Sequence, residues 1–222
     1  MISENQRPVG SNFKARSEPA QILEGIELHN KNVIVTGGYS GIGLETTRAL
    51  KNCGANVVVP ARRRDIASKA LEGIIASENI VEMDLADVSS VQNFVNDYVK
   101  EGLSLDLLIN NAGVMACPEG RVGNGWERQF GVNQIGHFVL TKGLMELMAK
   151  SEGSRFVSLS SSAHSLTGIL WDDIHFENTP YDKWIAYGQS KTASSLIAIE
   201  FDRIMKDTGV RGYSCLLYTS DA

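Results

Sequence analysis

TGGYSGIG, residues 36–43, is the stretch of sequence that decides the fold. It follows the apolar run NVIVT at residues 32–36, which is typical of a buried strand, and it opens a segment with helical periodicity. Glycines let the backbone turn tightly there, while the free N–H groups and the dipole at a helix start favour negative charge. The stretch therefore predicts a strand–turn–helix unit suited to a dinucleotide diphosphate, although such a turn can also serve close packing alone.

Apolar runs and helical patterns alternate along the rest of the chain. Expected strands lie at residues 32–36, 56–59, 80–83, 106–109 and 155–159, and expected helices include residues 43–52, 89–101, 132–150 and 183–206. Strands that alternate with helices indicate right-handed βαβ units and a parallel sheet with both faces covered. The expected fold class is therefore α/β, a doubly wound parallel sheet of the Rossmann type in a three-layer α/β/α sandwich.

The composition and the net charge limit the classes of protein to which the chain can belong. The chain has 222 residues, of which 43% are hydrophobic, and its 21 Lys+Arg against 26 Asp+Glu give a net charge of −5. This size and apolar content suit one globular domain and exclude a disordered or collagen-like chain. The mild acidity and the scattered basic residues exclude a basic surface for nucleic acid.

Cysteine usage and hydrophobic runs bear on where the protein works. Cys53, Cys117 and Cys215 are odd in number and lack a CxxC spacing, so they predict neither a disulfide framework nor a zinc cluster. The first thirty residues have no apolar segment of the kind found in secretory signals, and no run reaches the ~20 apolar residues that cross a bilayer. We expect a cytoplasmic protein with no membrane span and no metal.

Three regions differ along the chain. Residues 1–31 are polar and irregular and are expected to form an N-terminal arm, while residues 32–214 form the dinucleotide-binding domain. Residues 215–222 (CLLYTSDA) resemble translated vector sequence, so we expect a non-native tail and a truncated last strand that leaves a sheet edge exposed. In the preceding helix, apolar residues are spaced to form one buried stripe: Ile197, Phe201, Ile204 and Met205.

Residues 167–182 form a loop-like insert that is rich in acidic and aromatic residues. Trp171 and Phe176 lie in the insert, and Trp184 follows it. These three side chains either cover an apolar substrate pocket or pack the loop against the domain. His164 and His175 lie in or near the insert, where a substrate is within reach, whereas His137 is expected to be a core or interface residue. The spacing of these histidines with acidic residues makes no metal-ligand set.

The end of the second expected strand bears on the choice of nucleotide. An NAD site usually offers an acidic residue about 20 residues after the glycine turn, where it accepts a hydrogen bond from the ribose 2′-OH. Here the sequence reads PARR at residues 60–63, with no acid. The planar guanidinium of Arg62 matches a 2′-phosphate, which favours NADP(H) over NAD(H), while Arg63 and Arg64 are expected to be solvated.

YGQSK at residues 187–191 places a tyrosine and a lysine on one face of a helix, because Tyr187 and Lys191 are i and i+4 neighbours. A nearby ammonium favours the phenolate and lowers the tyrosine pKa from its usual value near 10. Such a tyrosine can exchange a proton with an alcohol or a ketone. The pair is weak evidence alone, since helices contain many such pairs by chance.

Three further motifs complete an ordered set. NNAG at residues 110–113 follows the fourth expected strand, Asn133 lies on the next helix, and SSS at residues 160–162 ends the fifth strand. Together with TGGYSGIG and YGQSK, this order and spacing resembles the short-chain dehydrogenase/reductase family over roughly residues 32–213. FVSLSSSAH and the long insert before the tyrosine resemble the retinol-dehydrogenase-like and protochlorophyllide-reductase-like branch.

The resemblance implies hydride transfer between a nicotinamide cofactor and a carbonyl or alcohol substrate, which would be a small lipophilic molecule. Tyr187 would be the general acid/base, Lys191 would bind the nicotinamide ribose and lower the tyrosine pKa, and Ser161 would hydrogen-bond the substrate oxygen. Asn133 would hold a water that links Lys191 to solvent. Members of the family commonly pair through the helices that hold Asn133 and Tyr187, so the resemblance also implies a homodimer or homotetramer.

The resemblance carries over to the cofactor site residue by residue. The glycine turn would line the diphosphate, the pair after the third strand would bracket the adenine, and the NNAG segment would lie beneath the cofactor ribose. With Arg62, the implied cofactor-binding residues are Gly37, Ser40, Gly41, Ile42, Gly43, Asp84, Leu85, Asn111, Ala112, Gly113, Tyr187 and Lys191.

Two other functions remain open on the same sequence. The chain could bind the dinucleotide without catalysis, or it could catalyse an epimerisation, a dehydration or an enone reduction on the same fold. The complete set of tyrosine, lysine, serine and asparagine argues against the first, because a protein that only binds has no need of that tyrosine.

Overall fold

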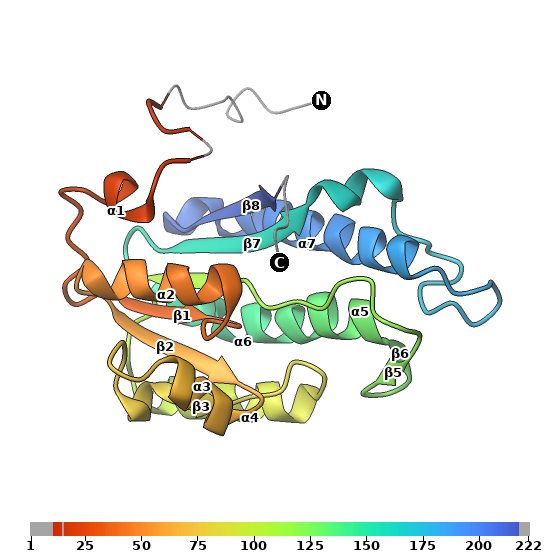
Figure 1. The fold of residues 1–222 in the computed structure, drawn as a ribbon, viewed down its shortest axis with the longest axis horizontal. Coiled ribbons are helices and arrows are strands. Elements are labelled where there is room, and N and C mark those ends of the chain that lie inside the picture. The colour runs from red at the N-terminus through yellow and green to blue at the C-terminus, as the bar shows by residue number, and fades with distance from the viewer. Residues whose placement is uncertain (1–10, 15, 218–222) are drawn as a thin grey trace.

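The computed structural model describes residues 11–14 and 16–217, and these form a central sheet of six strands in the order β3-β2-β1-β4-β7-β8 (Figure 1). Every neighbouring pair in this sheet is parallel. The order reverses between β1 and β4, which creates the crevice where ligands bind in open α/β sheets. The strands are β1 (Asn32–Val35), β2 (Asn56–Ala61), β3 (Ile80–Glu82), β4 (Leu107–Asn110), β7 (Arg155–Ser161) and β8 (Arg211–Leu217).

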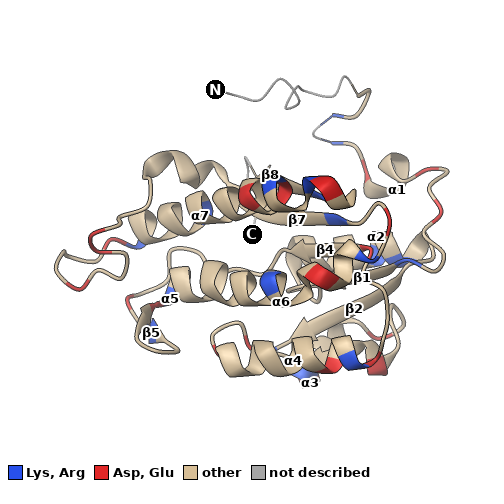
Figure 2. Cartoon of the chain, turned by 180° about the vertical axis from the view of Figure 1, so that it is seen from behind, with Lys and Arg blue, Asp and Glu red and all other residues tan. Residues whose placement is uncertain are grey.

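Helices cover both faces of the sheet. The helices α2 (Gly41–Asn52) and α3 (Arg64–Ala70) lie in front of it in Figure 1, and α4 (Val88–Lys100), α6 (His137–Ala149) and α7 (Lys183–Met205) lie on the opposite face, which Figure 2 shows from behind. Short 3₁₀ turns occupy Ser77–Asn79, Ser162–Leu166 and Lys206–Thr208, and α1 (Pro19–Ile22) precedes the sheet. The prediction of a doubly wound α/β sandwich is confirmed.

Two apolar cores hold the three layers together. Successive residues of a strand point to opposite faces, so Ile34 packs toward α4 and α6, while Val33 and Val35 pack toward α2 and α3. Phe156 of β7 packs against Phe201 of α7 with tilted rings whose centroids are 4.7 Å apart. Because the strands are buried on both sides, they read in sequence as continuous β-branched runs rather than alternating ones.

The helix expected at residues 132–150 is interrupted by a turn of different geometry. The segment starts as α5 (Arg128–Phe130), continues as a π-helical turn (Gly131–Gly136) and becomes regular only in α6. A small hairpin of β5 (Arg121–Val122) and β6 (Trp126–Glu127) precedes it. Hydrophobic periodicity predicts a helix here but does not distinguish the π turn, and π turns occur frequently at functional sites.

The stripe expected along α7 is partly wrong. Phe201 and Met205 are buried and Ile197 packs against the core, but half of the surface of Ile204 is exposed. Ile204 faces an apolar groove on the outer side of α6 and α7 instead. The apolar residues of α7 therefore serve two surfaces, one toward the sheet and one away from it.

The sixth strand, β8, pairs with β7 from Arg155↔Arg211 to Ser161↔Leu217 and lies at the edge of the sheet. It takes in the first three residues of the segment that we expected to be a tail, and residues 218–222 lie outside the described residues. About a third of the expected N-terminal arm, namely residues 1–10 and residue 15, also lies outside them. The proposed domain boundaries therefore stay predictions.

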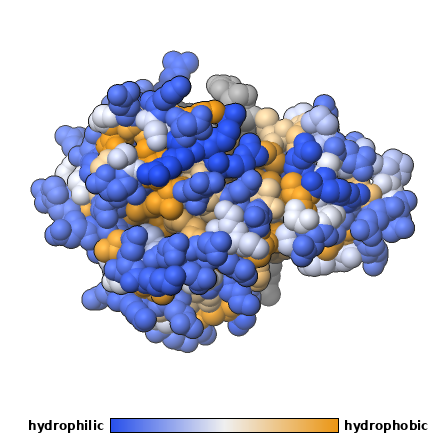
Figure 3. Space-filling view, turned by 90° about the horizontal axis from the view of Figure 1, so that it is seen from below, coloured by the Kyte–Doolittle hydropathy of each residue, from blue (hydrophilic) through white to orange (hydrophobic). Residues whose placement is uncertain are grey.

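The surface of the molecule carries charged residues of both signs. Basic and acidic residues are scattered among uncharged ones in Figure 2, and hydrophilic side chains cover most of the face in Figure 3, with apolar patches between them. In the described part of the chain, no helix is long and apolar enough to span a membrane, and no group of three or more His, Cys, Asp or Glu side chains could hold a metal. The three cysteines are free thiols. Location in the cytoplasm stays a prediction.

Candidate active site

The glycine turn between β1 and α2 has the geometry that a phosphate group requires. Gly37 and Gly41 adopt positive φ angles of 64° and 48°, which side chains of L-residues rarely allow. A Cβ atom added to Gly43 would lie 2.3 Å from Gly37 O, so the helix start packs directly on the turn. Ser40 is the N-cap of α2, yet its side chain makes no capping hydrogen bond. The first N–H groups of α2 are therefore open to an anionic ligand.

A cleft of about 610 Å³ lies at the carboxyl ends of β1 to β4, beside this turn. Its lining includes both polar and apolar groups and combines residues from all four strand ends. Of the residues implied by the resemblance, the cleft is lined by Gly37, Arg62, Asp84, Leu85, Ala112 and Gly113. The strand ends thus bring together segments that are far apart in the sequence.

Thr36 joins the glycine turn to the NNAG segment. Its hydroxyl oxygen accepts hydrogen bonds from the backbone N–H groups of Asn111, at 2.9 Å, and of Ala112, at 3.0 Å. Ala112 lies 76 residues after Thr36 in the chain. In return, Asn111 Nδ2 donates to Thr36 O at 2.9 Å. Sequence reasoning gave Thr36 no role, although it begins the quoted motif, because nothing in a single sequence indicates which hydroxyl bridges two strand ends.

Asn133 lies in the π-helical turn and holds the chain that follows the NNAG segment. Its side chain accepts from Val114 N at 2.8 Å and donates to Val114 O at 2.9 Å and to Ser190 Oγ at 3.0 Å. We expected Asn133 to hold a water that links Lys191 to solvent. In the structure the side-chain N–H groups are donated to protein atoms, so the side chain links the turn to Val114 and α7, and the water stays a prediction.

Tyr187, Lys191 and Ser161 meet where β7 ends against α7. Asp182 caps α7 by accepting hydrogen bonds from two backbone N–H groups, and the helix carries Tyr187 and Lys191 one turn apart on its buried side. Lys191 Nζ donates to Leu159 O at 3.0 Å and lies 5.6 Å from the centre of the Tyr187 ring. A Cβ atom added to Gly113 would lie 3.6 Å from Lys191 Nζ, so this group adjoins the cleft.

The electrostatics of Tyr187 differ from the sequence expectation. Burial lowers the pKa of Lys191 to about 8, because the ammonium loses hydration. Burial also raises the pKa of Tyr187, and a hydrogen bond from Ser161 only partly offsets this. We expected Lys191 to lower the tyrosine pKa, but its ammonium is directed at a backbone carbonyl and the ring face. The buried phenol therefore keeps its proton at neutral pH.

The choice among the three serines at the end of β7 agrees with strand alternation. Ser160 is fully buried, and its hydroxyl donates to Lys191 O at 2.8 Å. Ser161 points to the other side, where its hydroxyl meets the Tyr187 side chain and accepts from Ala163 N at 3.2 Å. His164 Nδ1 donates to Ser161 O at 2.7 Å, so that histidine orients the backbone at this position.

The insert at residues 167–182 packs against the β5–β6 hairpin, and its aromatic residues divide between the two expected roles. Phe176 is 6% exposed and packs the loop down, whereas Trp171 and Trp184 are 75% and 46% exposed. The Arg121 guanidinium donates to the carbonyls of His175 and Phe176. His175 is therefore part of the loop packing. Arg121 also lines the cleft, together with residues that the sequence did not assign to a site: Cys117, Arg128 and Val132.

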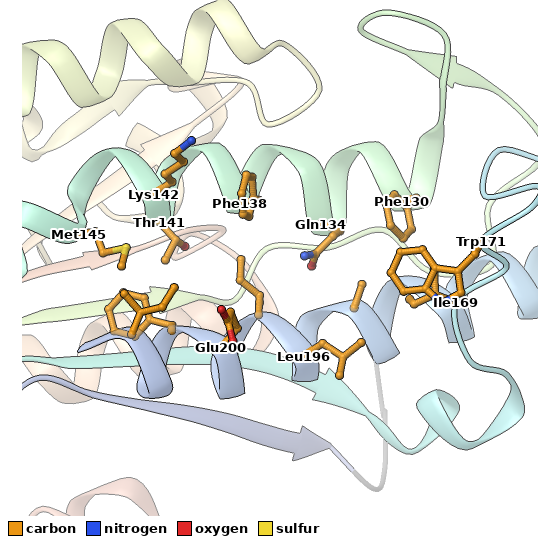
Figure 4. Close-up of a pocket in the computed structure, with 14 residues that line it drawn as sticks. Phe130, Gln134, Phe138, Thr141, Lys142, Met145, Ile169, Trp171, Leu196 and Glu200 are labelled. Carbon is orange, nitrogen blue, oxygen red and sulfur yellow. The ribbon is translucent and has the colours of Figure 1, made fainter. Parts of the chain in front are cut away.

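A second concavity, about 500 Å³, lies between the outer faces of α6 and α7 and is lined mainly by apolar side chains (Figure 4). Phe138 projects from α6 and Leu196 from α7, and each is close to half exposed. Lys142 and Glu200 lie on opposite sides of it. This groove contains none of the residues implied for the cofactor or for catalysis.

Comparison with known proteins assigns this geometry to a family. A family model described as short chain dehydrogenase matches residues 31–173, which is more than half of the chain. The chain belongs to the short-chain dehydrogenase/reductase family. It is 38% identical over 194 residues to retinol dehydrogenase 11 of Mus musculus, covering 85% of this chain and 61% of the mouse protein. It is 37% identical over 214 residues to the short-chain dehydrogenase TIC 32 B of Brassica napus, covering 90% and 66%.

These relatives support the retinol-dehydrogenase-like branch that the motifs indicated. The chain spans about three fifths of the length of the curated relatives, including 56% of human retinol dehydrogenase 13. A crystal structure of an uncharacterised protein from Mycobacterium paratuberculosis superposes with a TM-score of 0.73 and 33% identity, covering 86% of this chain and 69% of that one. An NADP complex of Pseudomonas aeruginosa RhlG, with a TM-score of 0.67 and 22% identity over 85% and 72%, supports the fold alone.

Proposed function

We propose that this member of the family is an NADP(H)-dependent oxidoreductase that interconverts a carbonyl and an alcohol, with Tyr187 as general acid/base. The observation that carries the proposal is the contact between the two parts of the site. Gly113 lines the dinucleotide cleft, and a Cβ atom there would lie only 3.6 Å from Lys191 Nζ. Lys191 in turn lies over the Tyr187 ring. A dinucleotide in the cleft would thus end beside the buried phenol.

The residues of the cleft suit the dinucleotide in shape and charge. The uncapped start of α2 and the glycines of the turn would receive the diphosphate, and the pair Asp84 and Leu85 would bracket the adenine. The nicotinamide group would supply or accept the hydride. The remaining steps, which bind and orient the substrate and move its proton, would fall to side chains of the chain itself.

Tyr187 would supply the proton to a carbonyl oxygen. Burial raises its pKa, so it carries its proton at neutral pH and can donate as the oxygen gains negative charge. Ser161 uses a lone pair to accept from Ala163 N, which leaves its O–H free to donate toward Tyr187 or the substrate oxygen. Lys191, charged below a pKa of about 8 and next to Gly113 of the cleft, would bind the nicotinamide ribose.

Arg62 supports a preference for NADP(H). It lines the cleft at the end of β2, beside Pro60, and its guanidinium is exposed to a ligand. Neither Pro60 nor Ala61 can accept a hydrogen bond from a ribose hydroxyl through its side chain, so the position suits a 2′-phosphate better. The curated relatives named retinol dehydrogenases suggest a lipophilic substrate, in keeping with the exposed aromatic residues of the insert.

The function is tested by following NADPH oxidation with a panel of aldehydes, ketones and retinoids, beside the same reactions with NADH. We expect turnover with at least one lipophilic carbonyl and a clear preference for NADPH. Binding of NADPH without turnover of any carbonyl or enone would favour the alternative of a dinucleotide-binding protein without catalysis. Turnover of an epimerisation or dehydration substrate, with no net NADPH oxidation, would favour the third class of function.

We also propose that the groove between α6 and α7 pairs with a second copy of the chain. A two-fold axis places the same surface on both sides of an interface, so it would set Lys142 of one copy against Glu200 of the other across an apolar centre. We expect Leu196→Glu to shift the protein toward monomer in sedimentation velocity. The control is Val99→Glu, because Val99 is similarly exposed on α4 outside the groove. An unchanged sedimentation coefficient for Leu196→Glu would contradict the pairing.

A further inference from the structure

His137 is a buried ionisable residue to which the proposed mechanism assigns no role. It begins α6, immediately after the π-helical turn, and only 3% of its surface is exposed. Its ring lies between two parts of the site. Nε2 is 2.9 Å from Thr36 Oγ1 at the end of β1, and Nδ1 is 2.9 Å from Asn133 O in the π turn. The sequence predicted a core or interface histidine and gave no sign of these contacts.

The direction of each hydrogen bond follows from counting donors and acceptors. The Thr36 hydroxyl has two lone pairs, and the N–H groups of Asn111 and Ala112 occupy both. Its single O–H must therefore be donated, and His137 Nε2 at 2.9 Å is a better acceptor than Ile109 O at 3.4 Å. A carbonyl oxygen can only accept, so His137 Nδ1–H donates to Asn133 O.

This arrangement leaves one protonation state for the ring. Nδ1 carries the proton and Nε2 carries a lone pair, so the imidazole is neutral. A second proton on Nε2 would meet the Thr36 oxygen, whose lone pairs are already used. Burial lowers the pKa of His137 to about 4, and the ammonium of Lys191 on α7 contributes in the same direction. Thr36 and Asn133, which contact the ring directly, carry no charge.

The ring also replaces a backbone contact that the π turn removes. In an α-helix the backbone N–H of residue 137 would bond to the carbonyl of residue 133. Here the backbone N–H of His137 donates to Gln134 O, and the His137 side chain takes the Asn133 carbonyl instead. The imidazole thus stabilises the irregular turn that carries the Asn133 side chain.

We propose that His137, as the neutral Nδ1–H tautomer, is a positioning residue that fixes the distance between the two halves of the site. On one side it holds Thr36, which fixes the N–H groups of the segment beneath the cofactor ribose. On the other side it holds the turn of Asn133, which is bonded through Ser190 to the helix of Tyr187. The inference rests on the proposed function, because the distance that matters is that between the dinucleotide and the phenol.

The kinetic test replaces the ring and keeps its volume. We expect His137→Phe to lower kcat by about 10- to 100-fold, since a misplacement of about 1 Å can have that effect. The dissociation constant of 2′,5′-ADP, which lacks the nicotinamide half, should change less than about threefold, because the hydrogen bonds of the ring go to Thr36 and Asn133 and not to Arg62 or a glycine of the turn. His137→Gln retains an acceptor that can reach Thr36 and should restore part of kcat. The control, His29→Phe, makes the same change at an exposed histidine and should have no effect.

A kcat for His137→Phe within twofold of the wild type would overturn the proposal, as would equal weakening of 2′,5′-ADP binding, which indicates a general loss of structure. If His137→Phe does not fold, or if no substrate is found, ¹⁵N NMR of the histidines in the unaltered chain decides. Of the 4 imidazoles, His137 and His164 both donate from Nδ1 to a carbonyl, and we expect that of His137 to remain the neutral Nδ1–H form down to about pH 5. A proton on Nε2, or titration of every histidine near pH 6.5, would overturn the proposal without bearing on the enzymatic activity.

Discussion

The two halves of the candidate site are built in different ways. The dinucleotide half is formed mainly by backbone and by glycines, which have no side chain. The glycine turn has positive φ angles, and the start of α2 packs directly against Gly37. The catalytic half consists of buried side chains, each held by named partners, such as Asn133 on Val114 and Lys191 on Leu159. The first half should therefore be sensitive to added atoms, and the second to removed atoms and to changes in protonation.

The largest effect in the dinucleotide half is expected from Gly43→Ala. The new Cβ would lie 2.3 Å from Gly37 O and 2.4 Å from Asn111 Nδ2, and neither backbone nor the bonded amide can yield easily. Overpacking of this kind costs about 1–3 kcal/mol, so NADPH binding should weaken by about 10- to 100-fold in a fluorescence titration.

The matched control is Gly168→Ala, because a Cβ there meets open space and its backbone needs no positive φ. It should bind NADPH as the wild type does. If Gly43→Ala binds normally while its fold is intact, the dinucleotide does not lie on this turn, and the contrast between the two halves fails.

A pH effect on stability is expected from the catalytic half. The pKa of His137 is about 4 in the folded chain and 6.5 when solvated, so between these values the unfolded state takes up a proton that the folded state does not. Stability is therefore complete above pH 6.5 and falls as the pH drops toward 4, by roughly 3 kcal/mol in all. Urea unfolding of the wild type and of His137→Phe from pH 7 to pH 4.5 measures the difference.

Lys191 acts in the opposite pH range. Its pKa is about 8 when folded and 10.5 when solvated, so stability should rise as the pH increases between these values, because the unfolded state then holds the extra proton.

The loss of stability on acidification below pH 6.5 should be smaller in His137→Phe than in the wild type, because the variant has no imidazole at this position. Identical slopes for the two proteins below pH 6.5 would show that His137 already titrates normally in the folded chain.

A more selective effect is expected from Arg62→Gln. A charged hydrogen bond to phosphate contributes about 1.5–3 kcal/mol, so NADPH should bind at least about 10-fold more weakly, while NADH binding should be nearly unchanged. Arg63→Gln is the control, since Arg63 is exposed but does not line the cleft. Equal weakening of both nucleotides by Arg62→Gln would refute the role of Arg62 at a 2′-phosphate.

The same contrast explains what the sequence could predict. The strands and the glycine turn were predictable because their signals are local: β-branched runs, helical periodicity, and glycines where a strand meets a helix. The candidate residues were found through ordered motifs, and the structure brings Tyr187, Lys191 and Ser161 together. The π turn was not predictable, because its hydrophobic pattern is that of an α-helix and one of its carbonyls, Asn133 O, is bonded by the side chain of His137.

The protonation states were also beyond the sequence. An i, i+4 lysine suggested a tyrosine with a lowered pKa, but burial acts on both groups and raises the pKa of Tyr187. Ile204 shows the same limit for packing: its spacing matches the buried stripe of α7, yet the chain exposes it on a second apolar surface. Periodicity identifies apolar faces but does not say how many surfaces a long helix serves.

The most direct test of the central claim compares Tyr187→Phe with Tyr213→Phe, which removes an exposed hydroxyl on β8. Both variants are assayed for NADPH binding and for turnover of the best carbonyl substrate. Loss of a general acid should lower kcat by about 10²- to 10⁴-fold in Tyr187→Phe and leave NADPH binding within about threefold, while Tyr213→Phe behaves as the wild type. Undiminished turnover in Tyr187→Phe would contradict the proposed mechanism.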